Sequence, residues 1–318
     1  MKSLKHFIGY IYLSLKEYGY DARRFVGGSL INGYNKTQSR FLGRITLYAH
    51  ALEKGVAMPN RRFNFGEKNL QILIGLCNEY ADKGFDIKRT QYVSAVEIIL
   101  EYAKIHKENN VSLPNDISES IDNIAKRFPH VSTSSQPVVT KGEMFFRGDF
   151  QYVANHRHSV RNFTGVVDER SLNAALELAN TSPSSCNRQQ CRVHVVNDRE
   201  LMMNVLKIQQ GNRGFGESAD KLLVVTVDVS SYNGLRERNC PYVDGGIFVM
   251  NLLYALQYYG IAACTLNCCF SAKDDREMCK LLNTKDAFIA VIAIGGCNDE
   301  LMVVHSKRIK PEEYIIKH

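Results

Sequence analysis

The first 128 residues carry a hydrophobic pattern that is typical of amphipathic helices. Apolar side chains recur at spacings of three and four residues, which places them along one face of each helix. Three such stripes are Phe41, Ile45, Tyr48 and Leu52; Leu70, Leu73, Ile74, Cys77 and Ala81; and Tyr92, Val96, Ile99 and Ala103. The pattern therefore predicts an all-helical domain over residues 1–128.

The N-terminal stretch MKSLKHFIGYIYLSLKEYGY combines a basic start with many apolar residues. Tyr10, Lys16, Glu17 and Tyr18 interrupt the apolar run, and no small-residue cleavage site follows, so the stretch does not read as a secretory signal. We expect an amphipathic helix here. A peripheral membrane role for this helix is the alternative interpretation.

Residues 129–142 are predicted to be a linker, because Pro129 and Pro137 enclose a run of small hydroxyl residues with little to bury. From residue 143 to 318 helical patterns alternate with apolar, β-branched runs at 192–197, 222–229 and 288–294. Asp168 and Ser271 are placed to cap two of the helices. This second region is predicted to be an α+β domain.

Composition narrows the class of protein. A hydrophobic content of 45% and a charged content of 23% are ordinary for a globular protein. No apolar run reaches the ~20 residues of a membrane span, so we expect a cytoplasmic protein without an integral membrane segment. The nine cysteines form no CxxC pair and no zinc-like spacing with histidine, so neither a metal site nor a disulfide framework is predicted.

The formal net charge of +7 does not by itself indicate a nucleic-acid partner. Lysine and arginine are scattered among 33 acidic residues, without a basic stripe interleaved with aromatic residues, so a nucleic-acid partner is not expected. A mild basic excess also suits small anionic ligands such as phosphates.

Four groups of residues in the second region could carry chemistry. Arg157, His158, Ser159 and Arg161 form a compact anion receptor, although a short basic run is also typical of a solvated face. A polar loop contains Pro183, Ser184, Asn187 and Gln189. Its side chains offer donors and acceptors to the edge of a flat heteroaromatic ring, although the same composition is also typical of an ordinary loop.

The third group is the segment 244–259, which is apolar almost all round and is therefore expected to be buried, within a domain or between subunits. The fourth is the glycine pair Gly295 and Gly296 at the end of a predicted strand, where a ligand could approach closely. The basic pair Lys307 and Arg308 follows and could meet the same anion as Arg157, or could be an ordinary basic C-terminus.

Taken in this order, these elements resemble the nitroreductase family over residues 145–318. The likeness rests on Arg-x-Ser-x-Arg at 157–161, on Pro-Ser-x-x-Asn-x-Gln at 183–189, and on the helix from Asp244 that ends in Gly260-Ile261. The resemblance implies a nitroreductase-like α+β fold, with a central, mostly antiparallel sheet flanked by helices. It also implies a homodimer, formed through the helix over 244–259, with two FMN molecules at the subunit interface.

Carried over to this sequence, the resemblance places Arg157, His158, Ser159 and Arg308 on the FMN phosphate and Arg161 near flavin N1 and O2. Ser184, Asn187 and Gln189, with the adjoining Pro183, would flank the ring and the ribityl chain, and Gly295 and Gly296 would lie near the phosphate end. This sequence departs from many relatives at Gln190 and Cys191, where they have proline and an aromatic residue.

The implied function is that of an FMN-dependent oxidoreductase. NAD(P)H would deliver hydride to flavin N5 and leave, and an unidentified electron-poor acceptor would then take the electrons. No catalytic side chain is assigned. The alternative is a non-catalytic, flavin-fold protein that binds or scaffolds within a glycan-assembly machinery.

The N-terminal region has a looser resemblance of its own. Residues 50–55 and 61–66 are similar to sequences that precede nitroreductase domains in some bacterial proteins of polysaccharide gene clusters, which suggests a polysaccharide-biosynthesis pathway. We predict a loop over residues 50–66. Either it covers the flavin and shapes the acceptor pocket, or it is a charged surface loop of a helical packing domain.

Overall fold

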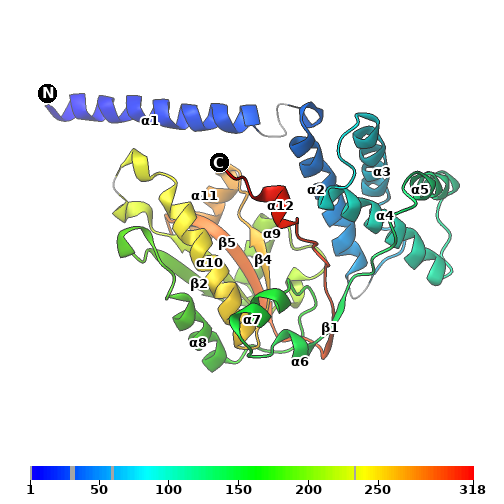
Figure 1. The fold of residues 1–318 in the computed structure, drawn as a ribbon. Coiled ribbons are helices and arrows are strands. Elements are labelled where there is room, and N and C mark those ends of the chain that lie inside the picture. Colours follow the sequence, from blue (N-terminus) through cyan, green and yellow to red (C-terminus); the bar gives the residue numbers. More distant parts are fainter. Residues whose placement is uncertain (1, 29–32, 59–60, 233) are drawn as a thin grey trace. The chain divides into compact units, whose positions relative to one another are not determined.

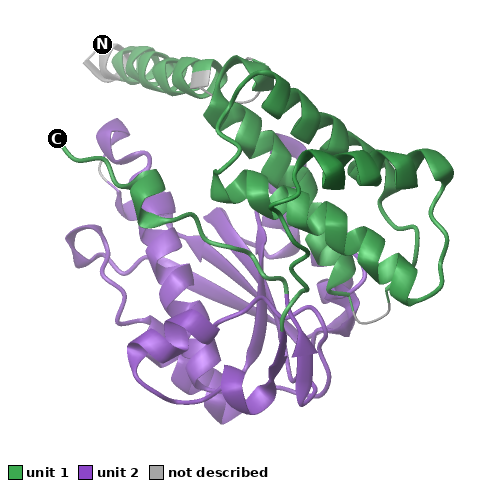
Figure 2. Ribbon diagram, turned by 45° about the vertical axis from the view of Figure 1, so that its right-hand side comes forward, with its two compact units in different colours: residues 1–137, 304–318 green, residues 138–303 purple. Residues whose placement is uncertain are grey.

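The computed structural model describes the chain except for residues 1, 29–32, 59–60 and 233 (Figure 1). The contacts divide the chain into two compact units (Figure 2). One comprises residues 1–137 and 304–318, and the other comprises residues 138–303.

The first unit is helical, as its periodicity predicts. Its elements are α1 (Lys2–Gly28), η2 (Tyr34–Lys36), α2 (Gln38–Val56), α3 (Glu67–Asp82), α4 (Thr90–Glu108), α5 (Asn115–Arg127) and α12 (Pro311–Tyr314). The stripes predicted for α2, α3 and α4 meet in one core, in which Phe41, Tyr80 and Tyr92 are almost fully buried. The helical region is therefore a packed body with its own core.

The loop predicted over residues 50–66 is shorter in the structure, because α2 continues to Val56. Gly55 lies inside the helix, and its missing side chain leaves room for the ring of Phe65. Two bonds hold the rest of the loop on α4: the Asn64 N–H donates to His106 Nε2 at 3.0 Å, and the Tyr102 hydroxyl donates to the Phe65 carbonyl at 2.9 Å. Pro59 and Asn60, within the predicted loop, lie outside the described residues.

The C-terminal residues 304–318 belong to this helical unit and are held by side chains. Glu313 forms an ion pair with Arg89 at 3.0 Å and accepts a hydrogen bond from the Thr90 hydroxyl. Lys307 pairs with Glu97, a residue of α4, at 2.5 Å. Residues far apart in the sequence thus complete one unit.

The second unit has an α+β architecture. Its strands are β1 (Val138–Thr140), β2 (Cys191–Val196), β3 (Lys221–Val227), β4 (Ala262–Asn267), β5 (Ala287–Gly295) and β6 (Glu300–Met302). Its helices are α6 (Lys141–Met144), α7 (Phe150–His156), α8 (Glu169–Ala179), η3 (Ser185–Asn187), α9 (Arg199–Gln209), η4 (Gly216–Ser218), η5 (Val229–Ser231), η6 (Leu235–Glu237), α10 (Cys240–Tyr258) and α11 (Ala272–Leu281).

The main sheet has four antiparallel strands in the order β2-β3-β5-β4, and β1 pairs with β6 in a separate two-stranded ladder. Helices α8 and α10 pack on one face through a core that includes Leu172, Leu252 and Ile292, while α9 and α11 pack against each other (Figure 1). The predicted fold class is confirmed: a central antiparallel sheet flanked by helices follows a helical region.

Both predicted helix caps are present. Asp168 accepts a hydrogen bond from the Ser171 N–H at 2.8 Å, and Ser271 forms a capping box with Asp274. The long apolar helix begins at Cys240, one turn before the predicted start, because Pro241 suits the first turn of a helix. Strand β4 was not predicted, since its sequence AACTLN lacks a run of β-branched residues.

Candidate functional site

The 157–161 segment, between α7 and α8, is held against the edge of the main sheet by its backbone. The Val160 N–H donates to the Ala263 carbonyl at 3.0 Å, and the Val160 side chain is buried. The neighbours Arg157, His158, Ser159 and Arg161 are half-buried. Arg161 donates to the Ser159 carbonyl at 3.3 Å, and its guanidinium carbon lies 5.9 Å from the centre of the Phe215 ring.

Glycines at the end of β5 permit the chain that follows this segment to approach closely. The Thr164 N–H donates to the Gly296 carbonyl at 2.9 Å, and the Gly296 N–H donates to the Gly165 carbonyl at 3.3 Å. A Cβ atom on Gly296 would lie 2.2 Å from the Thr164 carbonyl oxygen, and one on Gly295 would lie 3.0 Å from the side chain of Phe163. The structure thus brings the 157–161 segment and the glycine pair together.

The 184–189 loop has an unusual backbone. Cys186, Asn187 and Gln189 have φ values of 53°, 53° and 54°, in the left-handed region where non-glycine residues are strained. Local bonds hold this shape: the Gln189 N–H donates to Ser184 Oγ at 2.9 Å, and Gln189 Nε2 donates to Asn187 Oδ1 at 3.1 Å. Strain of this kind persists where the surroundings over-determine it, which is common at ligand sites.

Asp244, near the start of α10, is the main support of this loop. Its carboxylate is 5% exposed and accepts three hydrogen bonds, from the Ser185 N–H at 3.0 Å, the Ser185 hydroxyl at 2.9 Å and the Tyr232 hydroxyl at 2.8 Å. Burial and the bond to Asp244 raise the pKa of Tyr232 above its ordinary value. An acidic residue at the start of an otherwise apolar helix was the signal for this role, but the sequence did not reveal its partner.

The two groups of residues lie at opposite ends of the main sheet. Ala263, which binds the 157–161 segment, pairs with Ile294 near the end of β5. Cys191, which directly follows the 184–189 loop and Gln190, pairs with Val227, and Val227 pairs with Ala287 at the start of β5. Seven residues of β5 separate these points, or roughly 23 Å at the rise of an antiparallel strand.

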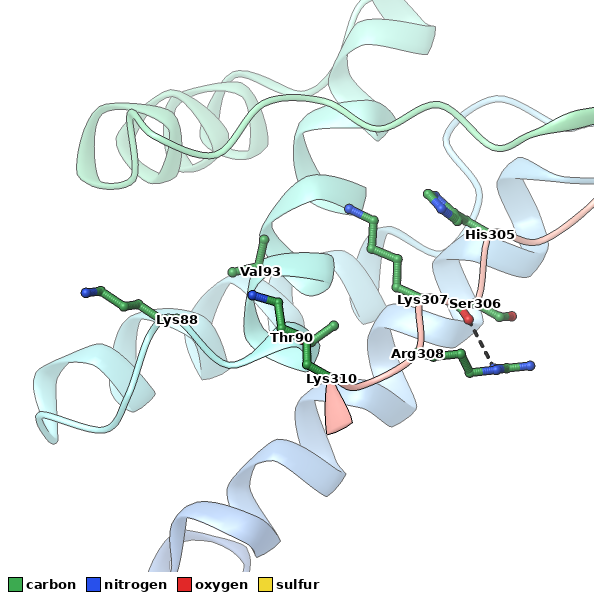
Figure 3. Close-up of a pocket in the computed structure, with 8 residues that line it drawn as sticks. All are labelled: Lys88, Thr90, Val93, His305, Ser306, Lys307, Arg308 and Lys310. Carbon is green, nitrogen blue, oxygen red and sulfur yellow. Dashed lines mark hydrogen bonds between the residues drawn. The ribbon is translucent and has the colours of Figure 1, made fainter. Parts of the chain in front are cut away.

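Arg308 belongs to the helical unit, where it lines an open pocket of about 520 Å³ (Figure 3). The other lining residues are Lys88, Thr90, Val93, His305, Ser306, Lys307 and Lys310. Arg308 donates to the Ser306 carbonyl at 3.0 Å, and in Figure 3 its side chain points away from Lys88. The pocket is rich in positive charge, which favours anionic ligands.

Helix α10 exposes an apolar stripe. Val243, Ile247 and Met250 follow one another at helical spacing and are 58%, 41% and 36% exposed, and Tyr242 beside them is 58% exposed. The opposite side of the helix, with Phe248, Leu252 and other residues, is buried in the core. The helix is therefore buried on one face and apolar but open on another.

These features define an α+β unit in which a basic segment and a constrained polar loop flank an antiparallel sheet. The family model of the nitroreductase family matches residues 154–211, a stretch that contains both the segment and the loop. The resemblance to the nitroreductase family is thereby confirmed for these residues. A comparison with curated proteins gave no match.

Several solved structures are similar to the C-terminal half of the chain. A protein provisionally named an NADH oxidase, from Clostridium acetobutylicum, has 20% identity and a TM-score of 0.46, over 52% of this chain and 99% of its own. A provisionally named nitroreductase from Exiguobacterium sibiricum, in complex with FMN, has 15% identity and a TM-score of 0.48, with 54% and 98% covered. An FMN-dependent nitroreductase from Clostridium difficile has 18% identity and a TM-score of 0.44, with 51% and 95% covered.

The described residues include no group of three or more His, Cys, Asp or Glu residues that could hold a metal ion. In the part of the chain that the structure describes, each helix is too short or too polar to cross a bilayer.

Proposed function

We propose that this chain is an FMN-dependent NAD(P)H oxidoreductase that works as a homodimer and binds the flavin between two copies. The observation that carries the proposal is the combination of a half-buried basic segment at one end of the sheet with a constrained carboxamide loop at the other. The match to the nitroreductase family over these same residues supports it.

The chemistry of the donor set fits FMN. Guanidinium groups and a hydroxyl, half-buried in the 157–161 segment, offer charge-assisted hydrogen bonds to a phosphate without leaving it fully in water. Asn187 and Gln189 are exposed, and each side chain has donors and an acceptor for the polar edge of a flavin ring. FMN, when bound, accepts hydride from a nicotinamide and passes electrons to an acceptor.

The residues of this chain would hold and tune the cofactor. Arg157, His158 and Ser159 would bind the phosphate, and Gly295 and Gly296 would keep the nearby backbone close. Arg161 would place positive charge near N1 and O2, where the reduced ring carries negative charge. Arg308, which the resemblance implies as a further phosphate ligand, belongs to the helical unit and lines its basic pocket.

A shared site between two copies is supported by the spacing of the two groups. Because the 157–161 segment and the 184–189 loop lie at opposite ends of the sheet, a two-fold dimer can bring the segment of one copy to the loop of the other. The exposed stripe of α10, with Val243, Ile247 and Met250, supplies an apolar surface for this contact. We therefore propose α10 as the core of the dimer.

The acceptor is proposed from the N-terminal resemblance alone. Residues 50–55 and 61–66 suggest that the electrons serve a polysaccharide-biosynthesis pathway in the cytoplasm. A molecule with an electron-poor group from that pathway would be the acceptor.

Titration of the purified protein with FMN, followed by quenching of flavin fluorescence, tests the cofactor. We expect binding by the unaltered chain and at least a tenfold weaker affinity for Arg157→Ala, since a charge-assisted hydrogen bond is lost. Arg199→Ala, which removes the same charge from the exposed start of α9, is the matched control and should leave the affinity unchanged. Failure of the unaltered chain to bind FMN refutes the proposal.

Anaerobic addition of NADH or NADPH then tests turnover. The flavin absorbance at about 450 nm should bleach with one or both donors. A protein that binds FMN but is reduced by neither donor would instead support the non-catalytic, scaffolding alternative.

Mixed dimers test whether the site is shared. Arg157→Ala disables the segment and Asn187→Ala disables the loop, so neither variant alone should bind FMN tightly. In a mixed dimer one of the two sites would receive an intact segment and an intact loop, so about a quarter of all sites should recover after random exchange of subunits. No recovery, despite confirmed exchange, would place both groups of one site on a single chain.

A further inference from the structure

Figure 1 shows α1 as a single long helix. This helix exposes large hydrophobic side chains along its length. Leu15 is 72% exposed, Phe25 66%, Phe7 62% and Ile8 57%. Helices of a packed domain bury such side chains in their own core, so this helix has an apolar surface that remains to be covered.

Most of the exposed aliphatic and phenylalanine side chains of α1 form one continuous stripe. At 100° per residue, Phe7, Ile8, Ile11, Leu15, Tyr18 and Phe25 fall within an arc of about 100°, the width of a typical apolar face. Val26 extends the stripe, which runs for about 28 Å along the helix at a rise of 1.5 Å per residue. The face is therefore long, narrow and straight.

The other side of the helix is mostly polar and carries an excess of positive charge. Residues 2–28 include five lysine and arginine residues against two acidic ones, Glu17 and Asp21, which gives three more positive than negative charges. Lys16 and Arg23 lie beside one another on the helical wheel, next to Tyr12 at the border of the stripe. Long basic side chains and tyrosines at such borders suit the headgroup region of a bilayer.

We propose that α1 lies in the plane of a membrane surface that contains anionic lipids, with its apolar stripe in the acyl boundary and its basic side chains on the lipid phosphates. The charges of Lys16, Glu17, Asp21, Arg23 and Arg24 in the second half of the helix favour this in-plane orientation, since each stays at the level of the headgroups. The helix would anchor the enzyme to that surface.

The charge pattern of α1 also argues against a second copy of the chain as the partner that covers the apolar stripe. The stripe has the three- and four-residue spacing of a coiled coil, but the positions that flank such a seam would pair Asp21 with Val26 and Ser14 with Gly19 across two helices. These pairs supply no salt bridge to fix the partner or its orientation. Gly9 and Gly19 lower the intrinsic stability of the helix relative to alanine, so a helix of this composition benefits from contact with an extended surface.

Sedimentation of the full chain with lipid vesicles tests this inference. We expect little binding to neutral phosphatidylcholine vesicles, and at least a tenfold higher affinity when about a third of the lipid is phosphatidylglycerol. Added salt should weaken the binding, because the electrostatic part of the attraction is screened. Failure to bind the anionic vesicles overturns the inference.

Two leucines of α1 provide a matched pair of variants. Leu15 lies in the stripe and Leu13 on the opposite, polar side, and both are exposed, at 72% and 44%. Leu15→Glu and Leu13→Glu make the same change in charge, and neither disturbs a core. We expect Leu15→Glu to lower vesicle affinity at least tenfold and Leu13→Glu to lower it no more than about threefold.

Equal losses for the two variants would mean that charge alone binds the lipid, and the stripe would have no role. Light scattering after size exclusion, without lipid, separates the remaining possibility. If Leu15→Glu lowers the oligomeric mass and Leu13→Glu does not, the stripe covers a second copy and the inference is wrong. Flavin binding measured in parallel is independent of these outcomes, so a failure here is distinguishable from a failure of the proposed function.

Discussion

The 157–161 segment and the 184–189 loop are held in place by opposite means. The segment and the residues after it keep their place through backbone hydrogen bonds to Ala263 and Gly296 and through the absence of side chains at Gly295 and Gly296. The loop keeps a strained backbone because side chains, above all Asp244, hold it. The 157–161 segment should therefore be sensitive to added volume, and the 184–189 loop to the loss of polar atoms.

Gly296→Ala should have the largest effect. The new methyl group would meet the Thr164 carbonyl oxygen at 2.2 Å, so one of the two backbones must move, and we expect a loss of about 3 kcal/mol in the free energy of unfolding together with weaker FMN binding. Urea unfolding measures the first effect and flavin fluorescence the second. Gly142→Ala, where nothing lies within 4 Å of the new atom, should cost little. Equal losses for both variants would contradict the close-approach argument.

Asp244→Ala should come next. Three donors would lose their acceptor, and leaving buried polar groups unpaired costs roughly 1–3 kcal/mol, so we expect a loss of about 2 kcal/mol and a disordered loop. The pKa of Tyr232 should fall toward its ordinary value, which a spectrophotometric titration of the tyrosines would follow. Asp244→Asn keeps one oxygen acceptor and should lie between the two proteins. A variant as stable as the parent would show that the loop does not depend on this carboxylate.

Gln189→Gly should separate stability from binding. Glycine relieves the left-handed backbone but gives up the side-chain bond to Asn187, so we expect the free energy of unfolding of the ligand-free protein to change little, while the loss of the carboxamide weakens FMN binding. Gln210, with a φ of 62° at the end of α9, offers a control of the same residue type. Gln210→Gly should stabilise the protein without changing FMN affinity. Thermal unfolding and FMN titration of both variants make the comparison.

The smallest expected effect concerns pH. His194 lies on β2 between the two regions, and burial lowers its pKa below the ordinary value of about 6.5 despite the nearby Asp286. Since the folded state then binds the proton less readily than the unfolded state, stability should fall as the pH drops below about 6.5 and level off below the folded pKa. His194→Gln should make the unfolding midpoint less dependent on pH over this window. An unchanged dependence would assign the effect to other groups.

Much of the fold could be predicted from local sequence. The runs at 192–197, 222–229 and 288–294 correspond to β2, β3 and β5, because buried strands are rich in β-branched residues. Strand β4, with AACTLN, has little of this signal, and β1 and β6 are only three residues long. Their pairing depends on partners distant in the sequence, which no local pattern encodes.

The candidate site divides in the same way. The basic segment, the polar loop and the glycine pair were recognisable by residue type and order. The bond between Ser185 and Asp244 joins positions 59 residues apart, and the left-handed backbone at Cys186 and Gln189 occurs in residues that rarely adopt it. Both features depend on tertiary packing, so the sequence did not reveal how the loop is held.

The return of residues 304–318 to the helical unit has a consequence for synthesis of the chain. Glu313 and Lys307 reach Arg89 and Glu97 only after the sheet unit between them has been translated. The helices can form early, but their unit stays incomplete until the C-terminal residues that form its last ion pairs have left the ribosome. We therefore expect that the sheet unit can complete its fold before the helical unit, although most of the helical unit is synthesised earlier.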